Sequence, residues 1–304
     1  LKVKVDYISD RYRVMELVSI DEGLEKICPK TENYDAVVIC DVDAKDRNDL
    51  LKYCYEHDMR TFLTPKISDV IIGGGERIHL FDSPLIQINS TGISLEEEVI
   101  KRFFDIVLCI IAVVVLSPLL LVVSIAIKLE DGGPVFYRQR RITKDMKEFD
   151  ILKFRSMIVD AEKNGAQAAV DGDSRITKVG HFIRATRIDE LPQLFNIIKG
   201  DMSIVGPRPE RVENVEEYSS YIPEFIFRYK VKGGLTGYAQ IFGKYNTTAY
   251  DKLRLDLMYI ENYTLLLDLK IILMTIRIVF KKESTEGFDK VITASDILET
   301  KEHE

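Results

Sequence analysis

The sequence predicts a mixed α/β protein with a membrane segment, and three observations support that prediction. Residues 1–88 alternate strand-like and helix-like patterns, which is typical of a parallel α/β unit. Residues 103–129 form a long, almost wholly apolar run. Residues 131–280 mix both patterns over a length that suits a compact second domain. We therefore expect an α/β unit, a membrane helix and a mixed α/β body, in that order.

The composition narrows the possible functions. The chain has 304 residues and a formal net charge of −7, which argues against a general nucleic-acid binder because such proteins usually carry a basic excess. Its four cysteines form no CxxC pair, and its four histidines are too scattered for a zinc site. We expect Cys28, Cys40, Cys54 and Cys109 to be reduced and buried.

The first unit shows a strand, a helix and a second strand. Residues 34–40 are β-branched and apolar, residues 46–57 have a helical apolar face, and residues 61–64 form a short strand before a proline. This order predicts a parallel pair of strands. The glycine run at 73–75 has the wrong spacing for a dinucleotide-binding fingerprint, and we interpret it as a flexible loop.

The apolar run from Phe103 to Leu129 is long enough to enter a membrane. At about 1.5 Å per residue, a helix of this length covers roughly 40 Å, against a hydrocarbon core of about 30 Å. A buried helix of a soluble core is disfavoured by that length. Pro118 lies near the middle, where it removes a backbone hydrogen bond, so the helix should bend there. The hydroxyl of Ser117 can satisfy the carbonyl that the proline frees.

Basic residues flank both ends of the run. Lys101 and Arg102 precede it and Lys128 lies at its end, and basic residues favour the cytoplasmic face of a membrane. A re-entrant helical hairpin over residues 101–130, broken at Ser117 and Pro118, meets this condition. A straight span with a kink is the alternative. The polar residues 89–100 are predicted to be a linker into the helix.

Adjacent carboxylates at Asp189 and Glu190 are the strongest chemical feature of the body. A carboxylate can attack phosphorus or bind Mg²⁺, and the guanidinium groups of Arg184 and Arg187 lie about one turn upstream, where they can hold phosphate oxygens. The alternative is that Asp189 caps a helix beginning near Pro192.

Two basic stretches follow the apolar run. Arg138, Arg140 and Arg141 are expected at the level of the lipid head groups, where each basic residue gains about 1 kcal/mol from anionic lipid. Lys153 and Arg155 add two more cations that can bind head groups or substrate phosphates. A solvated positive face is the alternative for any one of these residues.

From about Lys101 to Lys281 the chain resembles the bacterial sugar transferase family of monotopic polyprenyl-phosphate phosphoglycosyl transferases. The resemblance rests on several segments in the right order, which are KRFFD, the Ser117–Pro118 break, GGPVFYRQ, KFRSM, RITKVG, DELPQLFNIIKGDMSIVGPRP, GLTGYAQ and YIENYTLLLDLKI. Several such segments in order are far more specific than any single one.

The resemblance implies roles for particular residues. The catalytic pair of the family falls on Asp189 and Glu190, and its phosphate-binding arginine falls on Arg184. Its Pro-Arg-Pro motif falls on residues 207–209, which suggests a phosphate contact for Arg208. Its Ser-Pro helix break implies a re-entrant helix whose two ends are both cytoplasmic.

This chain also departs from the family pattern. A glycine is usual where Thr143 stands, a proline where Gly233 stands, and often an arginine where Lys244 stands. These departures affect fine details of the expected nucleotide pocket rather than the reaction class.

Residues 1–88 resemble the back half of the Rossmann-like domain of the long members of this family. Those members also carry several amino-terminal membrane helices, so we expect the chain beginning at Leu1 to be a piece of a longer protein. Residues 131–280 would then be the catalytic domain, and residues 281–304 a loosely docked tail.

The resemblance further implies transfer of a hexose 1-phosphate from a UDP-sugar to undecaprenyl phosphate, with release of UMP. Asp189 would form a covalent phosphosugar, Glu190 would hold Mg²⁺, and Arg184, Arg208, Lys153 and Arg155 would bind phosphates. The catalytic domain would lie on the cytoplasmic side of the bacterial inner membrane, at the first membrane step of exopolysaccharide, capsule or O-antigen synthesis.

Neither the sugar nor self-association follows from the sequence, so a homo-oligomer is left open. Two other functions are left open as well. One is a catalytically silent membrane adaptor in polysaccharide assembly, against which an intact Asp-Glu pair argues. The other is a soluble nucleotide-sugar oxidoreductase, which leaves the apolar run unexplained.

Overall fold

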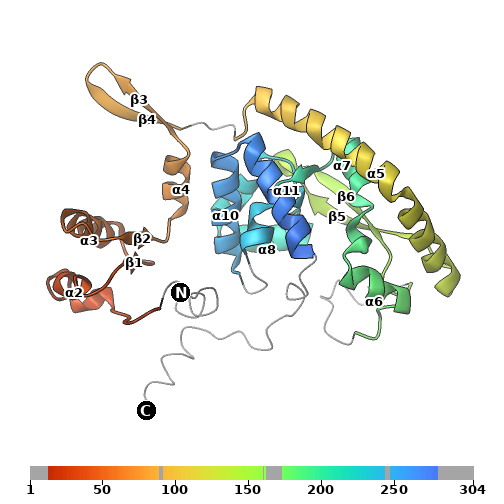
Figure 1. Ribbon diagram of the computed structural model, residues 1–304, viewed down its shortest axis with the longest axis horizontal. Coiled ribbons are helices and arrows are strands. Elements are labelled where there is room, and N and C mark those ends of the chain that lie inside the picture. The colour runs from red at the N-terminus through yellow and green to blue at the C-terminus, as the bar shows by residue number, and fades with distance from the viewer. Residues whose placement is uncertain (1–12, 89–91, 160, 162–172, 244–246, 280–304) are drawn as a thin grey trace, which may run out of the picture. The chain divides into compact units, whose positions relative to one another are not determined.

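A computed structural model describes residues 13–88, 92–159, 161, 173–243 and 247–279. It divides the chain into two compact units, Leu1–Lys66 and Ile67–Glu304 (Figure 1). Our expectations for the tail 281–304, for Lys244 and for residues 89–91 of the linker fall outside the described residues.

The first unit is the parallel α/β arrangement that the sequence predicts. Its elements are η1 (Ile20–Glu22), α2 (Leu24–Thr31), β1 (Val37–Ile39), α3 (Ala44–Glu56) and β2 (Thr61–Leu63). Strands β1 and β2 pair in parallel, with Val37 opposite Thr61. A small core of Ile27, Ile39 and Leu50 packs around the buried Cys54. All four cysteines are free thiols, and two of them, Cys28 and Cys40, are only half-buried.

The first unit ends earlier than we expected. We placed the boundary at residue 88, whereas the structure places it at Lys66. Helix α4 (Ile67–Gly73) packs on α10 (Ala249–Glu261) of the second unit. Ile67 and Val70 are buried in that unit's core, and this burial is why α4 belongs to the second unit.

The glycine run begins a β-hairpin rather than a simple loop. Gly73 ends α4, and strands β3 (Glu76–Leu80) and β4 (Ser83–Gln87) follow as an antiparallel pair. Gly74 lies so close to α10 that an added Cβ would be 2.5 Å from the Cβ of Glu261. Both strands are largely exposed on both faces, so the sequence lacks the alternation that would have predicted them.

The apolar run is one long helix, α5 (Leu95–Asp131). Ser94 caps its first turn, and the Glu97 side chain returns to the Ser94 backbone, which makes a capping box. Residues 95–100, which we assigned to the linker, are therefore helical. Gly132, with a φ of 73°, ends the helix in the left-handed conformation that favours glycine.

Helix α5 runs unbroken through Ser117 and Pro118, and Figure 1 shows it as one curved helix. The structure therefore does not confirm the re-entrant hairpin that we expected. The carbonyl of Val114 is the one that Pro118 cannot reach, and the Ser117 hydroxyl donates to it at 2.8 Å. This local repair, which the sequence predicted, lets the helix continue past the proline.

Helix α5 has the composition and exposure of a membrane-associated helix. Its most apolar 18-residue window has a mean hydropathy of 3.3, and only 11% of that window is buried against the protein. The rest of the helix presents large apolar side chains outward, such as Val115 (69% exposed) and Val122 (63% exposed). Lipid is the environment that accommodates such a surface.

The body that follows α5 is mixed α/β, as expected. Its elements are β5 (Phe136–Ile142), η2 (Lys144–Met146), β6 (Glu148–Phe154), α6 (Lys178–Ala185), η3 (Ile188–Glu190), α7 (Gln193–Lys199), β7 (Ser203–Val205), α8 (Val212–Tyr221), η4 (Pro223–Lys230), β8 (Gly234–Thr236), α9 (Tyr238–Phe242), α10 and α11 (Leu265–Val279). Strands β5 and β6 form an antiparallel pair and β7 and β8 a parallel pair.

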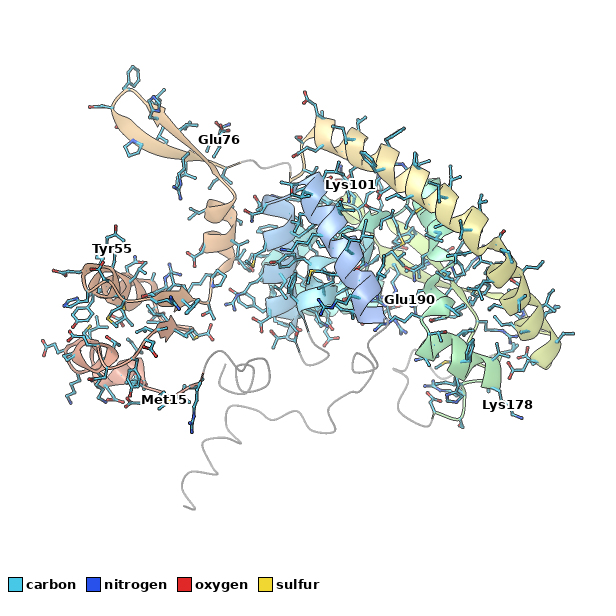
Figure 2. All side chains as sticks on the ribbon, in the orientation of Figure 1. Met15, Tyr55, Glu76, Lys101, Lys178 and Glu190 are labelled. Carbon is cyan, nitrogen blue, oxygen red and sulfur yellow. The ribbon has the colours of Figure 1, made fainter. Side chains whose placement is uncertain are left out.

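The KRFFD segment attaches the start of α5 to the body. Lys101 forms a buried ion pair with Asp268 of α11, and Figure 2 shows Lys101 where the two helices meet. Asp105 accepts hydrogen bonds from the Ser203 hydroxyl at 2.7 Å and from the Ile204 amide at 3.1 Å, both on β7. Cys109, one turn further on, packs into a core cluster with β6 and α7. One narrow stripe of α5 is thus bound to protein.

Candidate active site

Asp189 and Glu190 lie in the short 3-10 helix η3 between α6 and α7 (Figure 2). Arg187 precedes them with a φ of 55°, so the chain turns sharply as it leaves α6. Neither η3 nor α7 has a side-chain cap, and Pro192 occupies the cap position of α7. The alternative in which Asp189 is an ordinary helix cap is therefore wrong, and both carboxylates are available for other contacts.

Glu190 is held between two cations. Its Oε1 accepts from the ammonium of Lys153 at 3.3 Å and from the guanidinium of Arg208 at 3.0 Å. The Glu190 side chain is only 16% exposed. The structure thus brings three residues together that are distant in the sequence and that we assigned to the site separately.

The two carboxylates differ in acidity. Burial raises the pKa of Asp189, and the charge of Glu190 raises it further, against the opposing charges of Lys153 and Arg184. Burial also opposes ionisation of Glu190, but the charges of Arg208 and Lys153 outweigh it and hold the Glu190 pKa well below its usual range. Neighbouring carboxylates with opposite shifts are typical of a pair that divides two chemical roles.

A buried asparagine sets the distance between η3 and Lys153. Asn196 of α7 accepts a hydrogen bond from the Leu152 amide at 2.9 Å and donates to the Asp150 carbonyl at 2.8 Å, both on β6. This pair of bonds attaches α7 to the strand that carries Lys153. Asn196 lies in the DELPQLFN segment, but spacing alone gave it no role.

The Pro-Arg-Pro turn follows β7 and is rigidly fixed. The three carbonyls of residues 207–209 accept hydrogen bonds from the Gly234 amide at 2.8 Å, from Arg228 at 3.0 Å and from Arg141 at 2.9 Å. Arg228 is itself fully buried and pairs with Asp256 at 2.7 Å. Arg141, expected among the lipid head groups, therefore supports this turn instead. No sequence signal pointed to Arg228.

Close backbone packing explains the glycines around this turn. A Cβ at Gly234 would lie 2.1 Å from the Gly206 amide nitrogen, and a Cβ at Gly237 would lie 2.1 Å from the Gly206 carbonyl oxygen. Any side chain there would separate β7 from β8 and displace the loop that follows. The glycines of GLTGYAQ thus position Arg208.

Arg208 also contacts Gln240 of the same motif. The guanidinium donates to Gln240 Oε1 at 3.3 Å, while Gln240 Nε2 is buried with no hydrogen-bond partner among the described residues. A buried donor beside an arginine can bind an oxyanion. Sequence reasoning quoted Gln240 within its motif but gave it no function.

Two predicted phosphate-binding residues have different surroundings. Arg184 is in the last turn of α6, partly exposed, and its charge acts on Asp189. Arg155 instead forms a short ion pair with Asp131 at the end of α5. Gly133 of the GGP segment lies on that guanidinium, where a Cβ would be 2.5 Å from Nη1. Arg155 thus holds the end of α5 in place in this structure, apart from Glu190.

The exposed arginines of β5 are separate from the site. Arg138 and Arg140 alternate outward along the strand, and the side chain of Arg140 is 77% exposed. Their exposure is compatible with head-group contact and equally with a solvated face.

The acidic side chains of the site could bind a metal ion only if substrate oxygens supplied further ligands. No group of three metal-binding side chains occurs within the described part of the chain. Both cations contact Oε1 of Glu190, and Oε2 makes no hydrogen bond to a described residue. Mg²⁺ is commonly bound by one or two carboxylates together with substrate phosphates, and this donor set fits that mode.

Known proteins share this arrangement of segments. The family model for bacterial sugar transferases matches residues 96–282. The chain is 41% identical over 80% of its length to a UDP-N-acetylgalactosamine-undecaprenyl-phosphate N-acetylgalactosaminephosphotransferase of Aeromonas hydrophila. It is also 41% identical over 73% of its length to a UDP-glucose:undecaprenyl-phosphate glucose-1-phosphate transferase of Klebsiella pneumoniae. A galactosyl transferase of Streptococcus agalactiae is 37% identical over 68% of this chain.

The match is extensive along this chain but partial along the relatives. It covers 58%, 47% and 48% of those three proteins, so the chain spans about half the length of the curated relatives it matches. The family model itself covers more than half of this chain, including α5, the Asp-Glu pair and the Pro-Arg-Pro turn. The chain therefore belongs to the bacterial sugar transferase family.

Proposed function

We propose that this protein transfers a sugar 1-phosphate from a UDP-sugar to undecaprenyl phosphate. The observation that most supports this proposal is the pairing of Glu190 with Lys153 and Arg208 beside a carboxylate of raised pKa. Two of the relatives are named as undecaprenyl-phosphate sugar phosphotransferases. Those names and that of the third relative specify three different sugars, so the sugar stays open.

Asp189 is the proposed nucleophile. Its carboxylate attacks the sugar-proximal phosphorus, an acyl phosphate bond forms, and the bond between that phosphorus and the bridging oxygen breaks, so UMP leaves with the electron pair. An oxygen of the lipid phosphate then attacks the same phosphorus and restores the Asp189 carboxylate. A carboxylate whose basicity is raised is the better nucleophile of the two.

Glu190 and its two cations would bind the diphosphate. Lys153 and Arg208 already lie within 3.3 Å and 3.0 Å of Glu190, and both can turn their charge to phosphate oxygens when a substrate enters. Arg184 is placed to steady a phosphate on the Asp189 side. Mg²⁺, if held by Glu190 and the diphosphate, would offset charge on the leaving UMP. Arg155 would bind a phosphate once its ion pair with Asp131 opens.

Helix α5 accounts for access to the lipid substrate. Its apolar surface would place the body at the cytoplasmic face of the bacterial inner membrane, where a lipid phosphate can reach Asp189 without leaving the bilayer. We further propose that both ends of α5 lie on that face, and that the first unit derives from a Rossmann-like domain. The reaction would be the first membrane step of a capsule, exopolysaccharide or O-antigen pathway.

The nucleophile can be tested by trapping the covalent intermediate. Asp189→Asn should abolish the phosphosugar adduct and UMP release across a panel of UDP-sugars, because an amide is a poor nucleophile. Intact-protein mass spectrometry measures the adduct. Asp145→Asn is a matched control, since Asp145 is exposed at a φ of 58°, a conformation that asparagine tolerates.

An undiminished adduct in the Asp189→Asn variant would show that another residue is the nucleophile. If the unchanged protein gives neither adduct nor UMP with any sugar in the panel, the adaptor function is favoured.

The requirement for Mg²⁺ can be tested independently of the nucleophile. Chelation with EDTA should stop UMP release by the unchanged protein, and added Mg²⁺ should restore it. Glu190→Gln should raise the Mg²⁺ concentration needed for half-maximal adduct formation by about tenfold or more, the loss expected when one charged ligand is removed. UMP release that persists at full rate in EDTA would contradict a role for Mg²⁺.

A further inference from the structure

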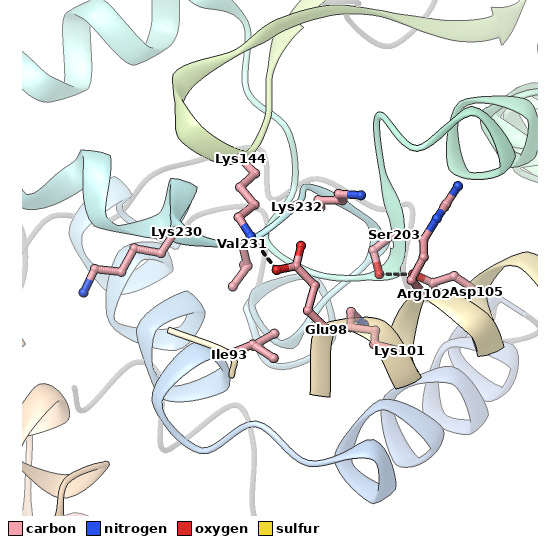
Figure 3. Close-up of a pocket in the computed structure, with 10 residues that line it drawn as sticks. All are labelled: Ile93, Glu98, Lys101, Arg102, Asp105, Lys144, Ser203, Lys230, Val231 and Lys232. Carbon is pink, nitrogen blue, oxygen red and sulfur yellow. Dashed lines mark hydrogen bonds and ion pairs between the residues drawn. The ribbon is translucent and has the colours of Figure 1, made fainter. Parts of the chain in front are cut away.

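A basic cavity lies at the start of α5, away from the Asp-Glu pair. Its empty volume is about 380 Å³, and part of it opens to solvent. Ten residues line it, as Figure 3 shows, and they are Ile93, Glu98, Lys101, Arg102, Asp105, Lys144, Ser203, Lys230, Val231 and Lys232. None of them is among the residues that contact Glu190.

The lining is strongly cationic. It contains five cationic side chains and two carboxylates, which leaves a net charge of +3. This sign is opposite to the net charge of −7 for the whole chain, so the cavity concentrates positive charge on an acidic protein.

Several of these charges already have partners. Lys101 is paired with Asp268, and Lys144 donates to Glu98 at 2.6 Å. Asp105 is occupied by hydrogen bonds from β7. These contacts occupy Lys101, Lys144 and Asp105, and the remaining cations of the lining form no ion pair with a described residue.

Three cations of the lining, Arg102, Lys230 and Lys232, form no ion pair with a described residue. Arg102 donates to the carbonyls of Ile197 at 2.5 Å and Ile198 at 2.8 Å in the last turn of α7, and it forms no ion pair with a described residue. Lys232 makes no hydrogen bond or ion pair to any described residue, and Figure 3 shows its side chain pointing toward Arg102. The ammonium of Lys230 points away from the other lining side chains.

The charges around Lys232 favour the binding of an anion. Burial lowers the pKa of Lys232, and the charges of Arg102 and Lys144 lower it further, against the opposing charges of Glu98 and Asp105. Two cations that face each other in a partly buried cavity repel, and a dianion between them would remove that repulsion.

A side-chain bridge through Thr143 holds the cavity walls together. The Gly233 amide donates to the Thr143 hydroxyl at 3.1 Å, and that hydroxyl donates to the Asp201 carbonyl at 2.9 Å. Glycine at 143 would lack the hydroxyl, and proline at 233 would lack the N–H. The bond joins the segment that carries Lys144 to the segment that carries Lys232, so Thr143 and Gly233 help to build the cavity.

The position of the cavity indicates which anion it meets. Lys101 and Arg102 immediately precede the apolar part of α5, so the cavity lies at the level where a membrane helix meets lipid head groups. We propose that this cavity binds a phosphate oxyanion between Arg102 and Lys232, as the head group of an anionic phospholipid provides. This site is separate from the Asp189 site and does not depend on the proposed transfer reaction.

The proposal can be tested by protection of Lys232 from amine acetylation, measured by peptide mass spectrometry on the full chain. Labelling of Lys232 should be compared in vesicles of phosphatidylcholine with and without phosphatidylglycerol, and in an uncharged detergent with and without inorganic phosphate. At about ten times the Kd of the ligand, labelling should fall roughly tenfold. Lys147 is the internal control, because it is exposed, lies in the turn that follows η2 and does not line the cavity.

The arms of the experiment distinguish the source of the phosphate. Protection by phosphatidylglycerol beyond that of inorganic phosphate assigns the site to a lipid head group. Equal protection by inorganic phosphate assigns it to a soluble phosphate. No protection by either, or protection of Lys147 to the same degree, overturns the proposal.

A second measurement separates this site from the Asp189 site. Lys232→Gln should reduce the thermal stabilisation that the phosphate ligand gives, whereas Lys147→Gln should leave it unchanged. Phosphate bound at Arg208 contributes equally in both variants and cancels from the comparison. An equal thermal shift in the two variants contradicts the proposal, even if the transferase activity is intact.

Discussion

At the scale of single residues, the Asp-Glu pair owes its chemistry to residues that are distant in the sequence. Lys153 on β6 and Arg208 after β7 both contact Glu190, and neither is near it along the chain. Local sequence identified two adjacent carboxylates, but the difference between their pKa values arises from this tertiary contact. The roles that we propose, charge binding by Glu190 and attack by Asp189, are based on this difference.

The raised pKa of Asp189 predicts the acid limb of the reaction. Asp189 must be ionised to attack, so adduct formation should fall as pH drops through a pKa higher than that of an ordinary aspartate. Lys153→Met removes a charge that lowers this pKa and should move the acid limb to higher pH. Glu190→Gln removes a charge that raises it and should move the limb to lower pH. The measurement is the pH profile of single-turnover adduct formation.

The two variants should shift the acid limb in opposite directions, which makes the test specific to the titration of Asp189. Lys147→Met removes a charge outside the site and should leave the profile unchanged. Shifts of Lys153→Met and Glu190→Gln in the same direction would mean that Asp189 is not the titrating group.

At the scale of elements, α5 shows how one side chain can preserve a helix through a proline. The pattern of the sequence predicted the apolar length and the use of the Ser117 hydroxyl, whereas the break that it predicted at Pro118 is not seen. It did not predict that residues 95–131 form one unbroken helix, because that depends on the contacts of α5 with β7, α7 and α6 along its length. The hairpin expectation rested on the Ser117–Pro118 break and on the basic residues at the two ends of the run.

The repair by Ser117 predicts non-additive effects of mutation. Ser117→Ala should destabilise the protein by about 1 kcal/mol, because it leaves the Val114 carbonyl without a donor in an apolar surrounding. In a Pro118→Ala background the same change should cost much less, because an alanine at this position supplies the N–H that proline lacks. Thermal unfolding in detergent measures both.

Ser124 provides the control within the same helix. Its hydroxyl donates to the Leu120 carbonyl at 2.7 Å, but that carbonyl also has its ordinary backbone donor one turn later. Ser124→Ala should therefore cost less than Ser117→Ala. Equal costs, or additive effects of Ser117→Ala and Pro118→Ala, would refute the repair.

At the scale of the whole molecule, the boundary at Lys66 assigns residues 67–88 to the second unit, whereas we had predicted that they belong to the first. Helix α4 buries Ile67 and Val70 against α10, although both precede the membrane helix in the chain. A segment belongs to the domain against which its apolar side chains are buried. When the element that buries them lies far along the chain, the local sequence carries no signal of that contact.

Truncation tests this boundary. A chain that begins at Ile67 should keep its thermal stability and its adduct formation, whereas one that begins at Asn89 should lose stability. The loss should be about 3 kcal/mol or more, because two buried aliphatic side chains are removed from the core. Thermal unfolding and adduct yield are the measurements.

A full chain with Ile67→Ala and Val70→Ala serves as the control, because it removes the same contacts without shortening the protein. If the chain that begins at Asn89 is as stable as the one that begins at Ile67, the boundary at residue 88 is restored.

The sequence by itself determined the family, the strand-helix-strand start, the membrane-associated helix and the identity of the carboxylate pair, because these depend on local order and composition. Only the tertiary structure decided that Arg141 and Arg228 support the Pro-Arg-Pro turn, that Arg155 pairs with Asp131, and that Lys153 and Arg208 meet at Glu190. The physical reason is that a charged side chain finds its partner through space. For a buried side chain the partner then determines the contact, because burying an unpaired charge costs several kcal/mol of stability.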